Sequence, residues 1–277
     1  TSVRTSAAEL RSARVRHGAR VAVTPWSRTS PPRRELRTPT VLLSELSMPI
    51  LTTLLASFVV LQTPQYSTRD VQGWKLHIRK ELLDDENRAE TEKAVRLLEQ
   101  QLAAVKKTVP NGAVAELVKV PLYFSPTYPK TVPSAAYHPG AKWLQENGRD
   151  PAMVQSIEFT NIAVFEPETR RMPAFALHEL AHAFHDRVLP GGFQNPEIIA
   201  AFEKAKAGGV YDSVPRKDAE GKITLEKAYG MNNPMEYFAE STEAFFFEND
   251  FYPFTSLQLK QVDPVGHALV GKLWNSR

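Results

Sequence analysis

Cysteine is absent from the 277 residues of the chain. This absence excludes disulfide scaffolds, thiolate zinc fingers, iron–sulfur clusters and cysteine nucleophiles, and it leaves His, Asp and Glu as the strong metal ligands. For the same reason, cysteine usage does not indicate the redox state of the compartment. The chain is long enough for one or two globular domains with a hydrophobic core.

A concentrated positive charge is also missing from most of the chain. The formal net charge is +3, but residues 1–47 hold nine Arg and three Glu, so this segment carries +6 and the rest of the chain −3. A mildly acidic body without a stripe of Lys and Arg argues against a surface that binds phosphate groups. We therefore expect no nucleic-acid partner.

The first 64 residues lack the pattern of a folded domain. Residues 1–47 are rich in Arg, Ser, Thr and Pro, which predicts disorder or a leader that is not native, since Met48 offers a second start. Residues 48–62 are a mainly apolar run without charge, shorter than the roughly 20 residues of a membrane span. The run is typical of a signal peptide, or alternatively of a buried strand or short helix. We expect a signal peptide at 48–64, a secreted or periplasmic protein and no stable membrane span.

Residues 65–277 have the length and pattern of one α+β domain. Apolar periodicity predicts strands at 74–79, 117–124 and 157–165. Helical spacing predicts helices at 84–107 and 141–147 and a mainly helical pattern after Pro173, with breaks at 190–192 and 208–222. Strands that precede helices favour an α+β fold over a doubly wound sheet.

The first indication of chemistry is His178-Glu179-Leu180-Ala181-His182, an HExxH sequence. Residues four apart on a helix lie above one another, so two imidazoles can bind one metal ion. Glu179 lies beside them, where its carboxylate could take a proton from a metal-bound water and pass it to a leaving amine. The helix is otherwise mostly apolar, and such polar groups are costly there unless paired or ligated. The alternative is a pair of ordinary surface histidines beside a solvated Glu.

Two histidines leave a catalytic zinc site one protein ligand short. The candidates in the rest of the chain are His185, Asp186, Glu236, Glu240 and His267. His185 is seven residues after the first histidine, too far along the helix for three imidazoles to converge on one ion. No glycine turn follows the helix, as the longer three-histidine pattern requires. A carboxylate from a separate helix is therefore the preferred third ligand.

That helix is predicted to begin after Asn233, a good N-cap residue, with Pro234 as a good first residue. Glu236, Glu240 and Glu243 follow at spacings of four and three, which places them on one helix face. A cation would relieve the repulsion between these carboxylates. The two histidines of the HExxH sequence independently indicate a bound cation. Alternatively, Glu236 is a capping acid that bonds back to Asn233, and Glu243 is merely solvated.

The HExxH sequence and Tyr229-Gly-Met-Asn-Asn-Pro-Met-Glu236-Tyr-Phe-Ala-Glu240 together resemble the lethal-factor-like zinc metallopeptidases. This gluzincin family includes the catalytic domain of anthrax lethal factor and the Pro-Pro endopeptidases. Its Tyr-Gly, seven residues before a Glu-aromatic-Phe-Ala-Glu segment, is far more specific than HExxH alone. The resemblance covers roughly residues 173–250 and the strand at 157–165. It implies a zincin-like fold, in which a small sheet packs on the HExxH helix and a glutamate-bearing helix follows.

The resemblance implies that His178, His182 and Glu236 bind Zn²⁺. It also implies that Glu240, one turn after the third ligand, orients a ligand histidine through its second ring nitrogen. If the register is shifted by one turn, Glu240 is the ligand and Glu236 is the capping residue.

The resemblance further implies that Glu179 is the general base and that Tyr229 donates a hydrogen bond to the oxyanion or the leaving amine. A plain core tyrosine is the alternative for Tyr229. In such enzymes an edge strand, here expected at 157–165, pairs with an extended peptide substrate. His138 and Trp143 are candidates for the cleft border, against the alternatives of a surface His and a core Trp.

The sequence therefore favours an exported zinc metalloendopeptidase that acts on peptides or proteins. The alternative from another class is a peptidase-like surface or binding module whose metal is structural or absent. Zinc hydrolysis of another amide, such as one in a cell wall, is disfavoured because the chain has no sugar-binding repeat. The segment 183–228 is where a wall or lid of the cleft is expected. The motifs leave the substrate specificity and the oligomeric state open.

Overall fold

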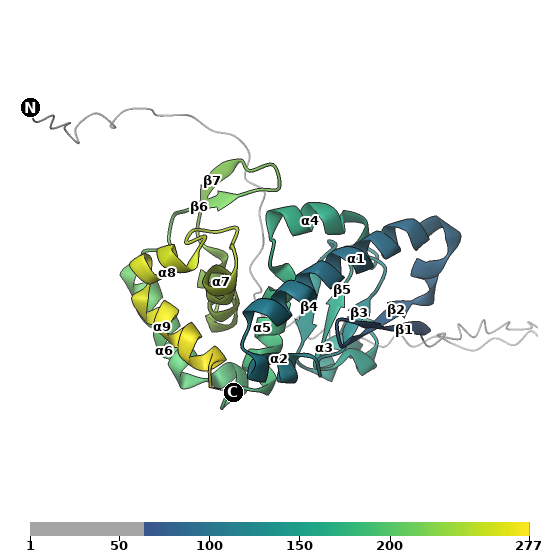
Figure 1. Cartoon of the computed structure of the whole chain (residues 1–277), viewed down its shortest axis with the longest axis horizontal. Helices are drawn as coiled ribbons and strands as arrows, with labels where there is room; N and C mark the ends of the chain where they lie inside the picture. The colour runs from purple at the N-terminus through teal and green to yellow at the C-terminus, as the bar shows by residue number, and fades with distance from the viewer. Residues whose placement is uncertain (1–63, 277) are drawn as a thin grey trace, which may run out of the picture. The chain divides into compact units, whose positions relative to one another are not determined.

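The computed structural model describes residues 64–276. The segment 1–47 and all but the last residue of the predicted signal peptide at 48–64 therefore lie outside the described residues. The described part combines a five-stranded mixed sheet with helices (Figure 1), which confirms the predicted α+β class. Among these helices, none combines the length and the apolar composition that crossing a membrane requires.

The main sheet has the strand order β1-β2-β3-β5-β4. The pairs β1/β2 and β4/β5 are antiparallel, whereas β2/β3 and β3/β5 are parallel. Its strands are Tyr66–Val71 (β1), Trp74–Arg79 (β2), Leu122–Phe124 (β3), Ala135–His138 (β4) and Ser156–Phe159 (β5). A separate hairpin is made of Val214–Lys217 (β6) and Ile223–Glu226 (β7).

The helices that precede the metal-binding motif are Asp85–Thr108 (α1), Asn111–Leu117 (α2), Ala141–Glu146 (α3) and Phe165–Arg171 (α4). The helix that carries the HExxH motif is Phe175–Arg187 (α5). The helices after it are Pro196–Gly208 (α6), Pro234–Phe246 (α7), Ser256–Val262 (α8) and Pro264–Trp274 (α9).

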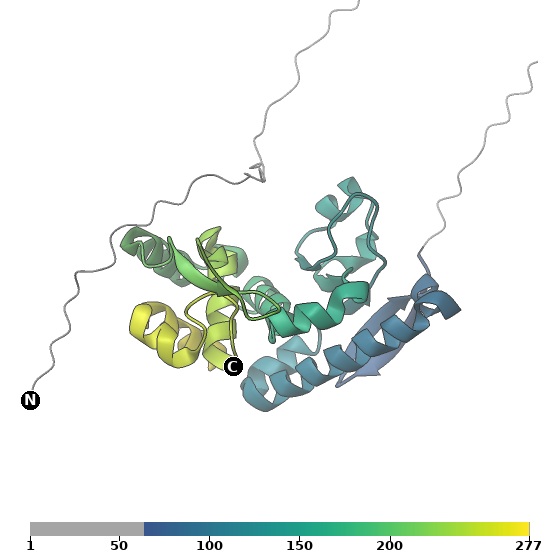
Figure 2. The same ribbon diagram turned by 90° about the horizontal axis from the view of Figure 1, so that it is seen from above.

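Helix α1 covers one face of the sheet. It buries Leu98, Leu102 and Val105, whose spacing of three and four residues forms one apolar stripe. These side chains share a core with Leu76 and Ile78 of β2, and α1 runs along the sheet in both views (Figures 1 and 2). The predicted strand at 74–79 and the predicted helices at 84–107 and 141–147 are confirmed, with shifts of one residue at helix ends.

Two predicted strands are partly wrong. Only Leu122–Phe124 of the predicted strand at 117–124 is extended, because Ala113, Val114 and Leu117 have the spacing of a buried helix face and form α2. The predicted strand at 157–165 ends at Phe159, and a short 3₁₀ helix then leads into α4. Pro167 in the first turn of α4 suits a helix and not a sheet interior. The shortened strand also lies inside the sheet, so β4 is the edge strand in its place.

Helices α5 and α7 pack against each other between the sheet and the C-terminal helices (Figure 1). Aromatic rings anchor this packing: Phe184 of α5 stacks on Trp274 of α9 with ring centres 4.1 Å apart. Phe238 of α7 lies on the same Trp274 ring. The indole nitrogen of Trp274 donates to the Thr242 hydroxyl of α7 at 3.0 Å. These contacts fix the relative position of the two helices that bear the predicted metal ligands.

We predict that Phe184→Ala lowers the free energy of unfolding by about 3–5 kcal/mol, because the lost ring leaves a cavity between three helices. Urea denaturation of the full chain measures this change. Leu225→Ala is the control, because Leu225 is 70% exposed and its loss changes the free energy by less than about 0.5 kcal/mol. Equal effects of the two substitutions would contradict the account of the packing.

Candidate metal centre and cleft

Helix α5 is buried along most of its length, which sets the environment of the HExxH motif. Every residue from Phe175 to His185 is buried, since the helix lies between the sheet, α1 and α7. His178, Glu179 and His182 are 5%, 9% and 9% exposed. They are therefore not ordinary surface residues, and the alternative interpretation of the motif does not hold.

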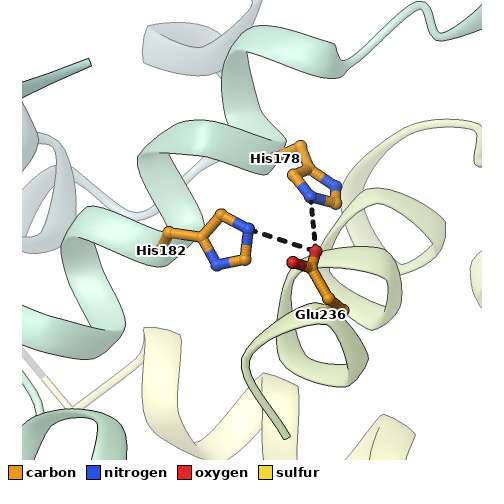
Figure 3. Close-up of side chains that lie close together, drawn as sticks. All are labelled: His178, His182 and Glu236. Atoms are coloured by element: carbon orange, nitrogen blue, oxygen red, sulfur yellow. Dashed lines mark hydrogen bonds and ion pairs between the residues drawn. The ribbon is translucent and has the colours of Figure 1, made fainter. Parts of the chain in front are cut away.

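The structure brings together His178, His182 and Glu236, the three predicted ligands. The histidines project from α5 toward Glu236 in the first turn of α7 (Figure 3). The Nε2 atoms of His178 and His182 lie 3.1 and 3.3 Å from the same carboxylate oxygen, Oε2 of Glu236. Asn233 caps α7 through its side chain, which accepts hydrogen bonds from Met235 and Glu236. The cap fixes the helix start, and the Glu236 side chain is left free to face the histidines.

The spacing of these three atoms fits a tetrahedral zinc site. Two ligand atoms bound tetrahedrally at about 2.0–2.1 Å from the ion lie about 3.3 Å apart, close to the distances between the imidazole nitrogens and the carboxylate. Two His and one carboxylate are also a donor set of catalytic zinc sites. A second group among residues 64–276 that could hold a metal ion, His178 with Glu240 and Glu243, offers only one imidazole and shares it with the first group.

Glu243, and not Glu240, makes the hydrogen bond to the second ring nitrogen of His178. The resemblance had implied this role for Glu240. The Nδ1 atom of His178 lies 2.7 Å from Oε1 of Glu243 but 4.0 Å from Oε1 of Glu240. Glu240 instead accepts a hydrogen bond from the Asn249 side chain at 2.9 Å. Glu240 and Glu243 lie about one helical turn apart on α7. Because of the way α7 crosses α5, Glu243 is the one that faces Nδ1 of His178. In the neutral imidazole, a proton on Nδ1 that is donated to Glu243 leaves Nε2 with its lone pair, which is the form that binds a metal.

The charges of the site favour a cation. Burial alone would lower the pKa of His178, but the hydrogen bonds to Glu236 and Glu243 raise it well above its ordinary value. The pKa of Glu236 falls below its ordinary range, because the hydrogen bonds of the two histidines outweigh burial. Burial and the neighbouring Glu243 raise the pKa of Glu240 to about 8. The raised pKa of Glu240 reflects carboxyl groups crowded together in a buried site, and a bound cation would relieve this crowding.

Edge strand β4 is tied to helix α5 through Tyr137. The backbone N–H of Tyr137 donates to Oε2 of Glu179 at 2.8 Å, and its hydroxyl donates to Asp186 at 2.8 Å. The Glu179 carboxylate is thus held at one oxygen by the strand. Sequence reasoning missed Tyr137, because a contact between residues 42 positions apart leaves no local pattern.

A cleft of about 470 Å³ opens beside His178 and Glu179. Tyr229, in the short 3₁₀ helix Tyr229–Met231, borders it, 45% exposed and with its ring centre 6.4 Å from that of His178. It is therefore not a plain core tyrosine. Burial and Glu236 raise the pKa of its hydroxyl to about 12, and within the described part of the chain this hydroxyl has no hydrogen-bond partner.

An ion-pair network lines part of the cleft. The buried carboxylate of Asp250 accepts hydrogen bonds from Arg171 of α4 at 2.7 Å and from Arg216 of β6 at 3.3 Å. Arg216 also pairs with Glu226 of β7 at 3.1 Å. The hairpin of β6 and β7 is thus joined to α4 across the cleft wall. The expectation of a wall within 183–228 agrees with this placement, because Arg216 and Glu226 line the cleft.

The remaining sequence candidates lie elsewhere. His185 is fully buried between the rings of Phe193 and Phe238, and His267 of α9 contacts Ser256. His138 is 4% exposed and bonded to Glu158 at 3.0 Å, while Trp143 is 40% exposed and stacked on His138. Neither His138 nor Trp143 lines the cleft. The alternative of a surface His and a core Trp is also wrong, because the His is buried and the Trp is exposed.

Comparison with known proteins adds little to this geometry. No family model matches the chain, and no curated protein matches its sequence. Among solved structures, the Pro-Pro endopeptidase PPEP-2 from Paenibacillus alvei is similar at 17% sequence identity and a TM-score of 0.38, over 66% of this chain and 90% of that chain. A likeness of this size establishes neither a shared family nor a shared activity, so the function rests on the residues of this chain.

We predict that His185 makes the metal-free protein acid-sensitive. Burial lowers the pKa of its imidazole to about 4, against about 6.5 in the unfolded chain. The unfolded state then binds more protons between these values, so stability is complete above pH 6.5 and falls as the pH drops toward 4. The shift corresponds to about 3 kcal/mol. His185→Leu removes this loss, as urea denaturation in chelator at several pH values measures.

The comparison between wild type and His185→Leu above pH 7 is the internal control, because the imidazole is neutral in both states there. Their difference in unfolding free energy stays constant in that range. Parallel curves for the two proteins between pH 6.5 and 4 would show that the buried imidazole has no part in the acid sensitivity.

Proposed function

We propose that the chain is a zinc-dependent endopeptidase in which His178, His182 and Glu236 hold the metal and Glu179 is the general base. One observation carries the proposal: two imidazole nitrogens converge on one carboxylate oxygen next to the cleft that Glu179 also lines. The further proposal that the enzyme is exported rests on the sequence of residues 48–64 alone.

A zinc ion held by these three side chains supplies Lewis acidity, which polarises a carbonyl group and lowers the pKa of water. The Glu179 carboxylate is positioned to accept the proton of the attacking water and to deliver it to the leaving amine. Its Oε2 accepts a hydrogen bond from the Tyr137 N–H, so within residues 64–276 Oε1 is the oxygen that remains to accept the proton. The Tyr229 hydroxyl stays protonated at neutral pH, with a pKa of about 12, and can donate to the oxyanion.

The edge strand β4 supports a peptide as the substrate. Residues Ala135 and Phe159 face each other in the antiparallel pair of β4 and β5, while Thr160 N donates to Ser134 O at 2.8 Å. Hydrogen-bonded and open pairs alternate in such a ladder, so the peptide groups of Ala135 and Tyr137 point away from β5. Ala135 lines the cleft, and an extended peptide can add to this edge. The substrate strand thus pairs with β4 and not with the strand expected at 157–165, which lies inside the sheet.

We predict that Glu179→Gln retains zinc and lowers kcat by about 10²- to 10⁴-fold, because the substitution removes the base and leaves the ligands in place. Cleavage of a randomised fluorogenic peptide library by the zinc-loaded full chain measures the rate. Glu90→Gln on the exposed face of α1 is the matched control and leaves kcat unchanged. Unchanged turnover by Glu179→Gln would exclude this mechanism.

We predict that substitutions of the three glutamates of α7 lower zinc affinity to different extents, according to the contact that each glutamate makes with His178. Glu236→Gln loses a ligand and has the largest effect. Glu243→Gln weakens the bond to Nδ1 and lowers affinity by about 10-fold, as for residues that orient a ligand. Glu240→Gln has the smallest effect, because Glu240 lies 4.0 Å from that nitrogen. Competition with a chromogenic chelator measures the affinities, and circular dichroism confirms folding. A larger loss in Glu240→Gln than in Glu243→Gln would contradict the assignment.

A further inference from the structure

Asn161 is a buried polar residue of the cleft that the proposed mechanism leaves unused. It follows β5, is 2% exposed and lines the cleft. Among residues 64–276, its Oδ1 atom finds no hydrogen-bond partner. A buried side-chain oxygen without a partner is unfavourable and uncommon in folded proteins. The residue therefore calls for an explanation.

The usual structural role of such a residue is not fulfilled. Asn161 is the N-cap residue of the 3₁₀ helix Ile162–Val164, a position where Asn normally bonds to the following backbone N–H groups. Its side chain makes no such capping bond. The side chain therefore does not stabilise the helix start. A molecule bound in the cleft could supply its hydrogen-bond partner.

The register of the sheet places Asn161 where the edge strand loses a donor. Continuing the pairing of β4 and β5 beyond Ala135–Phe159 and Ser134–Thr160 brings Pro133 opposite Asn161. By the alternation of the ladder, the backbone nitrogen of residue 133 points outward, but proline has no N–H to donate. In the other direction, the N–H of Tyr137 is already bonded to Glu179. Of the outward backbone positions 133, 135 and 137, Ala135 is thus the one whose N–H is left to donate to a substrate strand.

We propose that Asn161 binds a peptide group of the substrate through its side-chain amide, at the position where Pro133 has no N–H to offer. The amide offers one acceptor and two donors, so it can pair with either end of a peptide group. Two strand residues span about 7 Å, so the bound group lies about two residues farther from the scissile bond than the one facing Ala135. This inference rests on the proposed endopeptidase function. It adds a residue that positions the substrate main chain without selecting side chains.

The variant Asn161→Leu separates this role from a structural one. Leu has nearly the shape of Asn and replaces an unpartnered polar group, so the melting temperature of the full chain stays equal or rises. A structural role would lower it. For peptides cleaved by the zinc-loaded wild type, selected from a randomised decapeptide library, kcat/KM of the variant falls about 10-fold. Asn111→Leu, at an exposed Asn that begins α2 outside the cleft, leaves kcat/KM unchanged.

An ester scan of the best peptide identifies the bonded group. Each peptide group is replaced in turn by an ester, which removes the N–H and weakens the carbonyl acceptor. At one position the ester lowers kcat/KM of the wild type and has no further effect in Asn161→Leu, as expected when both changes remove one interaction. Wild-type kinetics in Asn161→Leu, or equal ester effects in both proteins at every position, would overturn the inference while the endopeptidase function stands.

Failure of the proposed function gives a different result. If the zinc-loaded wild type cleaves no peptide of the library, the endopeptidase proposal is wrong. Fluorescently labelled peptides from the same library are then titrated into zinc-loaded Glu179→Gln protein, with and without Asn161→Leu. A dissociation constant raised about 10-fold by Asn161→Leu supports the inference, whereas equal constants or no binding of any peptide overturn it.

Discussion

The contact of Glu236 with the two histidines is the interaction on which the rest of the site depends. It joins α5 to the first turn of α7 through atoms 3.1 and 3.3 Å apart. Glu243 makes a second such contact on the opposite side of the same His178 ring. Buried carboxylates and imidazoles are costly unless paired or ligated, so this arrangement is stable only if the two helices stay in register. The stacked rings of Phe184 and Trp274 supply that register.

The same helix α5 connects the metal centre to the sheet. Tyr137 of β4 bonds to Glu179 with its backbone and to Asp186 with its hydroxyl, so the edge that would pair with a substrate also fixes the proposed base. Arg171 and Arg216 both donate to Asp250, and these three residues also line the cleft. The cleft is thus lined by the strand edge at Ala135, by the ion-pair residues Arg171, Arg216 and Asp250, and by His178 and Glu179 of α5.

The sequence predicted the parts of the structure that depend on local pattern. The helix with His178 and His182, and the capped helix with Glu236, follow from spacings of three and four residues and from Asn233 and Pro234. The sequence did not predict the contacts between helices and strands. Nothing local distinguishes Glu243 from Glu240 as the partner of His178, since the crossing of two helices decides it. The position of β4 at the sheet edge depends on pairing between distant segments, and β5 was overextended because Ile162 and Val164 continue its apolar pattern.

The assignment of the metal ligands is the central claim, and anomalous diffraction at the zinc edge tests it most directly. Crystals of the full chain grown with zinc are predicted to show one strong anomalous peak about 2.0–2.1 Å from Nε2 of His178, Nε2 of His182 and a carboxylate oxygen of Glu236. A peak bound by Glu240 in place of Glu236, or no peak between α5 and α7 in zinc-saturated crystals, would contradict the account.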